Sequence, residues 1–398
     1  MIAGQQVDVG VTEVSASTVR IMIRPIDSEG WPELPAPTGA LEQYDVGREL
    51  AKAARSASAI SKVHAGELIV RFTDNPPTFH IESAAGRVVQ TISFDSISNG
   101  MGFRLGNGPL LGLGEGGPQF DRKGSVDRMI IGQGGYRLGT HGTRAPIQWL
   151  IGTDGWAMFI HQPYGSFDFT GSTGLFTPGA KGLLPLDLFV VGSNDPTVIM
   201  REYARITGLP EMPARWTFGY QQSHRTLNGP DEILGVARTM REKKLPCDTL
   251  IYLGTEFAPS GWNTRNGEFT WHATNFPDPK KMIDTMHDEH FKVVLHIVIE
   301  GRHLTGSVTD PCTAPPLPSG RTPDNRWPPD RQVSCYWPWH KPLMDVGVDG
   351  WWPDQGDDFD GPSELNRHRM YWEGTQLYRP NQRPYALHRN ASAGVQRF

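Results

Sequence analysis

Cysteine, excess positive charge and long apolar runs are all scarce in this chain of 398 residues. Its three cysteines, Cys247, Cys312 and Cys335, are too few and too unevenly spaced for a disulfide framework or a zinc site. We therefore expect reduced thiols. The formal net charge of −5 shows no basic excess, which argues against a nucleic-acid partner. We find no motif for a metal or nicotinamide site and predict no cofactor.

Apolar segments are too short to cross a membrane, because a spanning helix needs about 18 or more consecutive apolar residues. The N-terminal stretch from Met1 to Glu13 also lacks the basic segment and apolar run of a signal peptide. We therefore expect a cytoplasmic protein with no membrane partner, provided that Met1 is the true start. The sequence does not indicate an oligomeric state.

Glycine, proline and tryptophan are abundant, with 45, 33 and 12 residues respectively. Many turns and a large aromatic surface are typical of β-rich and barrel architectures, and they also suit sugar binding. The chain is longer than the roughly 250–300 residues at which a single hydrophobic core usually stops growing. We therefore expect two domains, residues 1–208 and residues 209–398.

Alternating apolar and polar residues, interrupted by turn residues, dominate the first part of the chain and predict antiparallel strands. The predicted strands are 17–23, 67–72, 78–81, 88–92 and 187–191, and 152–160 is predicted to be a turn that leads into a strand. A β-sandwich is the natural way to bury such strands. A helix is predicted from Thr197 to Ile206, ending at Gly208 before two prolines.

Strands and helices alternate after Pro213, which predicts parallel β/α units in a barrel or a doubly wound sheet. Five strands are predicted at 216–221, 249–253, 292–298, 350–354 and 384–388, with helices at 230–244, 278–290, 341–346 and 363–378. A proline-rich loop covers 310–338. A complete eight-stranded barrel needs about 250 residues, so we expect an incomplete (β/α)8 TIM barrel in a C-terminally truncated fragment.

The fourth of these strands ends in carboxylates, at Asp354 and then Asp357, Asp358 and Asp360. Catalytic carboxylates lie at such a position on the C-terminal rim of a β/α barrel. An acidic turn that binds nothing, or a loop resembling a calcium site, explains the segment equally well. His296 and Glu300 suggest a metal pair, but no third ligand is near, and a packed histidine is the better interpretation.

Several segments resemble glycoside hydrolase family 31, which comprises retaining α-glucosidases, α-xylosidases and their relatives. The segments occur in the family's order at Gly112–Glu115, Gly208–Ser223, Leu245–Asp248, Phe276–Pro279, Val348–Asp354, Arg389 and Gly394–Arg397. The resemblance implies a galactose-mutarotase-like sandwich before the barrel, and a carbohydrate substrate with an α-glycosidic bond.

The resemblance also implies roles for individual residues. Asp354 matches the family nucleophile in Trp352-Pro353-Asp354, while the acid/base aspartate is expected after Phe398. Retention requires these two carboxyl groups to lie about 5–5.5 Å apart. Arg389 matches an arginine that binds the sugar.

Four further residues are expected to contact the substrate or line its site: Trp352, Asp248, Asp357 and His224. Trp352 could instead fill the barrel interior, Asp248 could cap a strand, and Asp357 and His224 could be loop residues. Since neighbours on a strand alternate, at most one of Trp351 and Trp352 should point inward, and Trp351 is expected to pack.

Two sequence features depart from the family and leave other functions open. The family aspartate that ends the second strand has no counterpart at Leu253–Glu256, and Gln355-Gly356-Asp357 replaces the usual residues after the nucleophile. A carbohydrate-binding protein or inactive fragment without the acid/base residue therefore remains an alternative to a hydrolase. A sugar isomerase or epimerase on the same fold is a weaker one.

Overall fold

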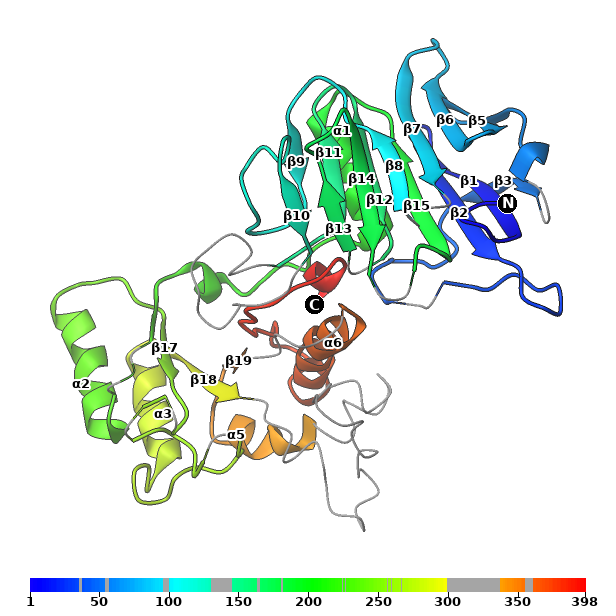
Figure 1. Ribbon diagram of the computed structural model, residues 1–398. Helices are drawn as coiled ribbons and strands as arrows, with labels where there is room; N and C mark the ends of the chain where they lie inside the picture. The colour runs from blue at the N-terminus through cyan, green and yellow to red at the C-terminus, as the bar shows by residue number, and fades with distance from the viewer. Residues whose placement is uncertain are drawn as a thin grey trace. The chain divides into compact units, whose positions relative to one another are not determined.

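The chain divides into two compact units in the computed structural model (Figure 1). The first unit comprises Met1–Leu209 and Ala391–Gln396, and the second comprises Pro210–Asn390 and Arg397–Phe398. The structure describes residues 1–35, 38–53, 57–95, 100–129, 145–162, 165–179, 182–223, 225, 227–255, 257–258, 260–265, 267–298, 337–354 and 361–398.

Two antiparallel sheets build the first unit. In spatial order, the seven-stranded sheet contains β3 (Arg48–Ala53), β1 (Val7–Ser15), β2 (Thr18–Pro25), β15 (Leu186–Val191), β12 (Trp156–Ile160), β11 (Trp149–Gly152) and β9 (Leu110–Gly112). The eight-stranded sheet contains β10 (Val126–Arg128), β13 (Gly165–Asp168), β14 (Thr173–Pro178), β8 (Gly100–Arg104), β7 (Val88–Asp95), β6 (Pro77–Ser83), β5 (Leu68–Asp74) and β4 (Val63–Ala65). A short 3-10 helix, η1 (Ala57–Ala59), precedes β4.

The main core of this unit lies between the two sheets. Val9 and Ile21 from the seven-stranded sheet share one apolar cluster with Val70, Phe79 and Phe103 from the eight-stranded sheet. Because apolar side chains alternate with polar ones along these strands, each sheet buries one face against the other. The predicted β-sandwich is therefore confirmed for the described residues, while its likeness to galactose mutarotase stays a prediction.

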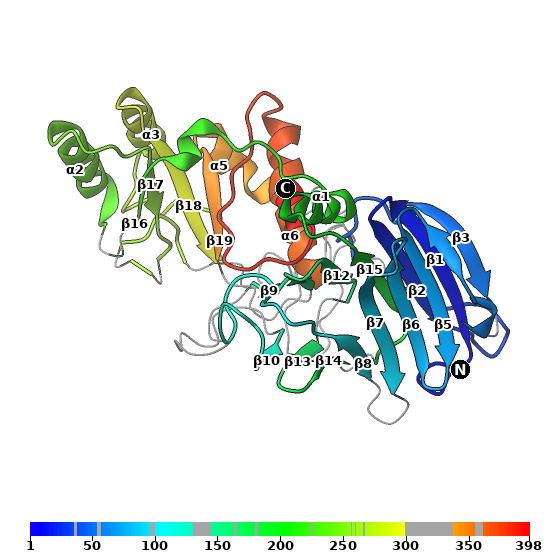
Figure 2. The same ribbon diagram turned by 90° about the horizontal axis from the view of Figure 1, so that it is seen from above.

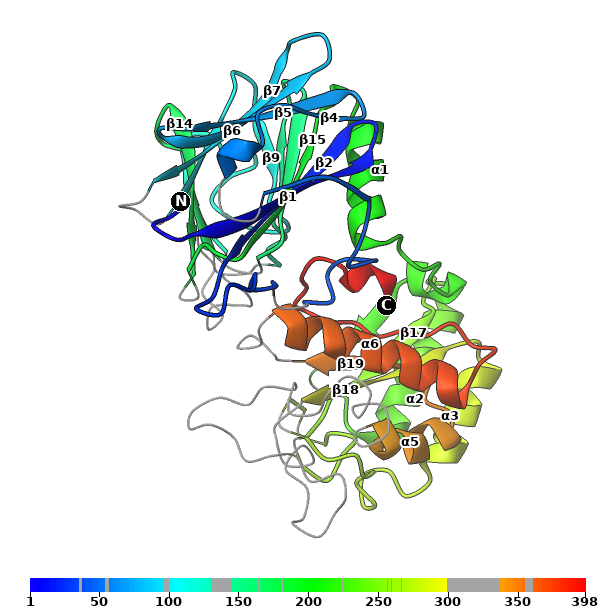
Figure 3. The ribbon, with the colours of Figure 1, turned by 90° about the vertical axis from the view of Figure 1, so that its right-hand side faces the viewer.

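Helix α1 (Pro196–Thr207) covers the other face of the seven-stranded sheet (Figure 3). Its N-terminus is capped by Asp195, whose carboxylate accepts a hydrogen bond from the Thr197 N–H. Ile199 and Ile206 pack with Phe159 and Phe189 in a second apolar cluster. The helix ends at Gly208, as its sequence predicts.

A parallel sheet forms the centre of the second unit, in the order β16 (Gln221–Ser223), β17 (Thr249–Tyr252), β18 (Lys292–Val298) and β19 (Gly350–Asp354) (Figure 2). Its helices are α2 (Gly229–Glu242), α3 (Pro279–Asp288), α5 (Lys341–Asp345) and α6 (Gly361–Tyr378), and its 3-10 helices are η2 (Arg215–Phe218) and η4 (Trp337–Trp339). A last 3-10 helix, η5, spans Val395–Arg397. None of the helices in the described part of the chain is long and apolar enough to cross a membrane.

The two faces of this parallel sheet differ in what they contact. Leu250, Leu295 and Trp351 lie on the outer face and share an apolar cluster with Ile233 of α2 and Ile283 of α3. The opposite face, here called the inner face, carries the side chains that alternate with these. Strands buried on both faces and covered by helices on one are what a β/α barrel requires.

Two of the five strands predicted for this unit were placed wrongly. The segment 216–221 is mostly not extended, because Arg215–Phe218 forms a 3-10 helix and the strand is only Gln221–Ser223. The segment 384–388 contains no strand, although Ala386 forms a single parallel bridge with Trp351. Most of the predicted loop 310–338 lies outside the described residues.

Asp349 connects α3, β18 and the start of β19. Its carboxylate lies 2.7 Å from His287 Nε2, and it accepts hydrogen bonds from Lys292 Nζ at 2.9 Å and the Val293 N–H at 3.0 Å. Burial alone raises the pKa of the Asp349 carboxyl, but these partners outweigh burial and hold that pKa below its ordinary value. The carboxylate therefore stabilises the folded state while it is ionised.

Replacing Asp349 with asparagine is expected to lower the free energy of unfolding of the second unit by about 1–3 kcal/mol at neutral pH. Solvent screening limits the effect, because the Lys292 and His287 side chains are 40% and 33% exposed. Since the folded-state pKa is lowered, the loss should be present above about pH 4 and shrink as pH falls, when the wild-type carboxylate also protonates. Urea denaturation at pH 7 and pH 3.5 measures both effects.

The matched control is Asp345→Asn, which removes an exposed carboxylate paired with Lys341 on α5. A surface pair of this kind contributes about 0.3–0.5 kcal/mol. Equal losses for the two variants, or a loss for Asp349→Asn that does not change with pH, would contradict the assigned role of Asp349.

Candidate active site

Asp354 is the last residue of β19 and lies at the C-terminal edge of the parallel sheet. In a strand, side chains alternate between faces, so Gly350, Trp352 and Asp354 share the inner face. The register pairs Trp352 with His296 and Asp354 with Val298 on β18. Asp354 is buried, with 4% of its surface exposed.

Both carboxylate oxygens of Asp354 have a nitrogen partner. Arg389 Nη1 lies 3.2 Å from Oδ1, and His296 Nε2 lies 3.1 Å from Oδ2. Arg367, a fully buried residue of α6, donates from Nη2 to the Asp354 main-chain carbonyl at 2.7 Å. The neighbouring guanidinium of Arg389 favours the ionised form of the carboxylate. The site therefore holds the Asp354 carboxylate in a defined orientation at the end of β19.

Arg389 reaches this site from the segment that follows the bridge at Ala386. Its side chain is 14% exposed, so a large part of the guanidinium is enclosed by protein. The structure thus brings together Asp354 and Arg389, two residues that the sequence comparison with the family singled out separately.

The two tryptophans before Asp354 point to opposite faces, as their alternation predicts. Trp351 is 2% exposed and packs on the outer face with Trp337 and Tyr371. Trp352 lies on the inner face, where its ring centroid is 4.6 Å from that of His296. Trp352 is therefore the tryptophan placed near Asp354, and its predicted contact with substrate stays a prediction.

Asp248 is not brought together with Asp354, which corrects the expectation that it belongs to the site. It immediately precedes β17, so it lies at the N-terminal edge of the sheet. The strand register places it seven positions below Asp354, about 23 Å away along the strands at 3.3 Å per residue. Its main-chain carbonyl accepts a hydrogen bond from the Lys292 N–H, which is a contact within the sheet. His224 and Asp357 lie outside the described residues.

His296 is the residue of this site whose role sequence reasoning missed. It lies in the middle of the apolar strand β18, is fully buried, and contacts Asp354. A metal role has no support in the described part of the chain, where no group of three or more suitable ligands occurs. The sequence signal that could have indicated this role was a single histidine within an apolar strand. Its position beside Trp352 follows only from the strand register.

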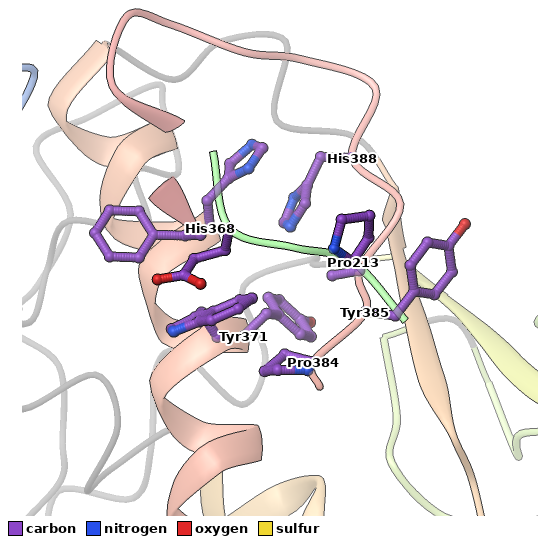
Figure 4. Close-up of a pocket in the computed structure, with 10 residues that line it drawn as sticks. Pro213, His368, Tyr371, Pro384, Tyr385 and His388 are labelled. Carbon is purple, nitrogen blue, oxygen red and sulfur yellow. The ribbon is translucent and has the colours of Figure 1, made fainter. Parts of the chain in front are cut away.

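A cavity of about 180 Å³ lies elsewhere in the second unit, and neither Asp354 nor Arg389 lines it (Figure 4). His368 and His388 face each other in it with ring centroids 3.6 Å apart. Burial lowers the pKa of His368 to about 3 and also lowers that of His388. Both imidazoles are therefore neutral packing groups at ordinary pH, and we do not include this cavity in the site.

The fold and site define a protein with a β-sandwich unit and a parallel β/α unit that carries a carboxylate and an arginine at the C-terminal edge of its strands. Barrel enzymes place their chemistry at this edge. The family model described as Glycosyl hydrolases family 31 TIM-barrel domain matches residues 210–398.

Several known glycosidases are similar to this chain in sequence or in structure. An α-xylosidase of Saccharolobus solfataricus is 26% identical over 172 residues, covering 43% of this chain and 23% of that protein. Alpha-glucosidase 2 of Bacillus thermoamyloliquefaciens is 24% identical over 284 residues, covering 58% of this chain and 34% of that protein. A dextranase of the same family from Flavobacterium johnsoniae, solved with glucose, superposes with a TM-score of 0.79 at 19% identity, covering 99% of this chain and 53% of that one.

By this match, residues 210–398 of the chain belong to glycoside hydrolase family 31. The chain covers only 23% and 34% of the length of these two curated relatives. The dextranase likeness, at 19% identity, supports the fold alone.

Proposed function

We propose that this chain carries the nucleophile of a retaining α-glycoside hydrolase, and that Asp354 is that nucleophile. The observation that carries the proposal is the pairing of Asp354 with Arg389 at the C-terminal edge of β19. Because two relatives are named as an α-xylosidase and an α-glucosidase, we propose an α-xyloside or α-glucoside as substrate.

In the proposed reaction, one oxygen of Asp354 bonds to the anomeric carbon while the bond from that carbon to the glycosidic oxygen breaks. A carboxylic acid protonates the departing oxygen, and we expect this acid to be the residue predicted after Phe398. Water then attacks the anomeric carbon and gives a proton back to the acid residue, while the bond to Asp354 breaks. This step restores the Asp354 carboxylate and the original anomeric configuration.

Arg389 is proposed to serve both the nucleophile and the sugar. Its Nη1 lies beside Asp354 Oδ1 and favours the ionised carboxylate. A guanidinium offers five N–H donors, so donors that do not face Asp354 suit hydroxyl groups of the bound sugar. Trp352, on the same inner face and partly exposed, is proposed to lie against a face of that sugar.

The test is covalent trapping with a fluorinated α-glycosyl fluoride of glucose or xylose, followed by peptide mapping. Fluoride leaves without being protonated, so the experiment examines the nucleophile independently of the acid/base residue. We expect a glycosyl adduct on the peptide that contains Asp354. The electron-withdrawing ring fluorine slows both formation and breakdown of the intermediate, while the fluoride leaving group keeps formation fast, so the intermediate accumulates.

The possible outcomes separate the proposed functions. A label on another residue would show that Asp354 is not the nucleophile. Saturable sugar binding without any adduct would instead favour the carbohydrate-binding protein without turnover.

A further inference from the structure

His296 is a polar side chain in an apolar strand, and it is completely buried. Its neighbours on β18, Val294, Leu295, Ile297 and Val298, are buried apolar residues. Burying an imidazole costs free energy unless its two ring nitrogens have hydrogen-bond partners. The partners of His296 therefore indicate what keeps it at this position.

The hydrogen-bond partners of His296 indicate which nitrogen of the neutral imidazole carries the proton. The Gly254 N–H donates to Nδ1 across 3.4 Å. A backbone N–H can only donate, so Nδ1 must present a lone pair, and the single ring proton of the neutral imidazole resides on Nε2. Nε2 faces Asp354 Oδ2 at 3.1 Å. His296 is thus arranged to donate an N–H hydrogen bond to the carboxylate.

Aromatic side chains hold the imidazole in this orientation. Phe257 and Trp352 contact it with ring centroids 4.7 and 4.6 Å away and interplanar angles of 68° and 71°. The Trp262 indole N–H donates to the His296 carbonyl at 2.7 Å, which fixes the main chain beneath the ring. A histidine enclosed in this way cannot rotate away from Asp354 without disturbing its neighbours.

We infer that His296 is a positioning residue for the nucleophile: its Nε2–H holds Asp354 Oδ2 and thereby fixes the direction in which Oδ1, beside Arg389, faces the anomeric carbon. This inference rests on the proposed function of Asp354. During the step, the Oδ1–carbon bond forms, and the electrons of the bond to the leaving group depart with that group. Oδ2 becomes the carbonyl oxygen of the glycosyl ester and still accepts the Nε2–H, so the proton does not move.

The charged and titratable groups around Asp354 that the structure describes come from three elements. They are His296 on β18, Arg367 on α6 and Arg389 after the bridge at Ala386. Arg367 donates to the main-chain carbonyl, whereas His296 and Arg389 each contact one carboxylate oxygen. Loss of the His296 donor should favour protonation of the buried carboxylate and loosen its orientation.

The experiment compares the rate of adduct formation from the α-glycosyl fluoride in two variants, His296→Phe and His296→Gln. Phenylalanine fills the space without a donor, whereas the glutamine amide N–H can reach the place of Nε2–H. We expect His296→Phe to slow trapping by about 30- to 100-fold and to move the acidic limb of the pH–rate profile up by about one pH unit. We expect His296→Gln to recover most of the rate and the wild-type limb.

Three results would overturn the inference. The first is a His296→Phe variant with the trapping rate and pH profile of the wild type. The second is an equal loss of trapping rate in both variants with no movement of the acidic limb, which is what a packing role would produce. The third comes from NMR of the ring nitrogens in wild-type protein labelled with 15N-histidine, so it does not require any variant to fold. There, a His296 imidazole protonated on Nδ1 at neutral pH would contradict the assigned hydrogen bond.

Failure of the proposed function looks different from failure of this inference. If the wild-type protein forms no adduct on Asp354, the nucleophile assignment fails, and the inference fails with it. If Asp354 is labelled and the two His296 variants react as the wild type does, only the role of His296 is wrong.

Discussion

Asp354→Ala is expected to lower the turnover of an aryl α-glycoside with an activated leaving group by about 10⁴-fold or more, the order of loss seen when a catalytic nucleophile is removed. A loss of 10⁴-fold corresponds to about 5.5 kcal/mol of activation free energy. The activated phenolate leaves with little need for a proton, so the assay reports on the nucleophile. Steady-state release of the phenolate measures the effect.

Azide should restore part of the lost activity in this variant, because it can enter the space vacated by the carboxylate. In the proposed reaction, Asp354 attacks the anomeric carbon from the face opposite the leaving group. Azide arriving from the same side should therefore yield a β-glycosyl azide from the α-glycoside. Chromatography and the anomeric coupling constant of the product identify it.

Asp248→Ala is the matched control, since it removes the same carboxylate group from the N-terminal edge of the same sheet. Its turnover should stay within about two-fold of wild type, as expected for a residue about 23 Å from Asp354 along the strands. Equal losses for the two variants would refute the separation of the two aspartates. Unchanged turnover in Asp354→Ala would remove Asp354 from catalysis.

Much of the fold was predictable because its signals are local. The carboxylate of Asp195 caps the N-terminus of α1 and marks where that helix begins. Asp278 caps α3 in the same way, by accepting a hydrogen bond from the Lys281 N–H. The strand Gly350–Asp354 is marked by an apolar run that stops at a carboxylate. The opposite directions of Trp351 and Trp352 follow from strand alternation alone.

Other features depend on contacts between distant segments and could not be predicted in this way. His296 reaches Asp354 only because β18 and β19 pair in parallel with His296 beside Trp352, a register that no local pattern encodes. The aromatic segment beginning at Trp216 has the residue pattern of a strand. Trp216 nevertheless lies in the 3-10 helix η2, where its ring packs against that of Tyr385. Tertiary packing overrode local propensity there.

Asp248 shows a different kind of error, which strand direction could have prevented. It precedes its strand, whereas Asp354 ends one, and parallel strands place those positions at opposite edges of a sheet. The motif similarity at Leu245–Asp248 therefore identifies the family without identifying a residue of the site.

The second large effect is expected in the first unit, where Asp187→Asn should lower the free energy of unfolding by about 3–5 kcal/mol. Asp187 is fully buried on the face of the seven-stranded sheet that α1 covers. Arg20 donates to it from two nitrogens, at 2.7 and 2.8 Å, and His161 Nδ1 lies 2.9 Å away. Asparagine keeps the shape but leaves the buried Arg20 guanidinium without its counter-charge.

Asp154→Asn provides the comparison at an exposed pair. Asp154 and Arg104 form the same kind of ion pair in the same unit, but their side chains are 23% and 34% exposed. Removing that carboxylate should cost about 1 kcal/mol or less. Replacing both buried partners, with Arg20→Met and Asp187→Leu, should recover part of the loss, because no uncompensated charge then remains.

The pH dependence separates this electrostatic cause from a simple packing defect. Burial alone raises the pKa of Asp187, but His161 and Arg20 outweigh it and hold the pKa below its ordinary value. The stabilisation is therefore present above about pH 4 and is lost as pH falls through the lower folded-state pKa. The stability difference between wild type and Asp187→Asn should narrow in acid, because wild type then loses the same charge. Urea titrations at several pH values, together with hydrogen exchange of the β2 and β15 amides, measure this narrowing. A stability difference between the two proteins that stays constant with pH would show that lost packing is the cause.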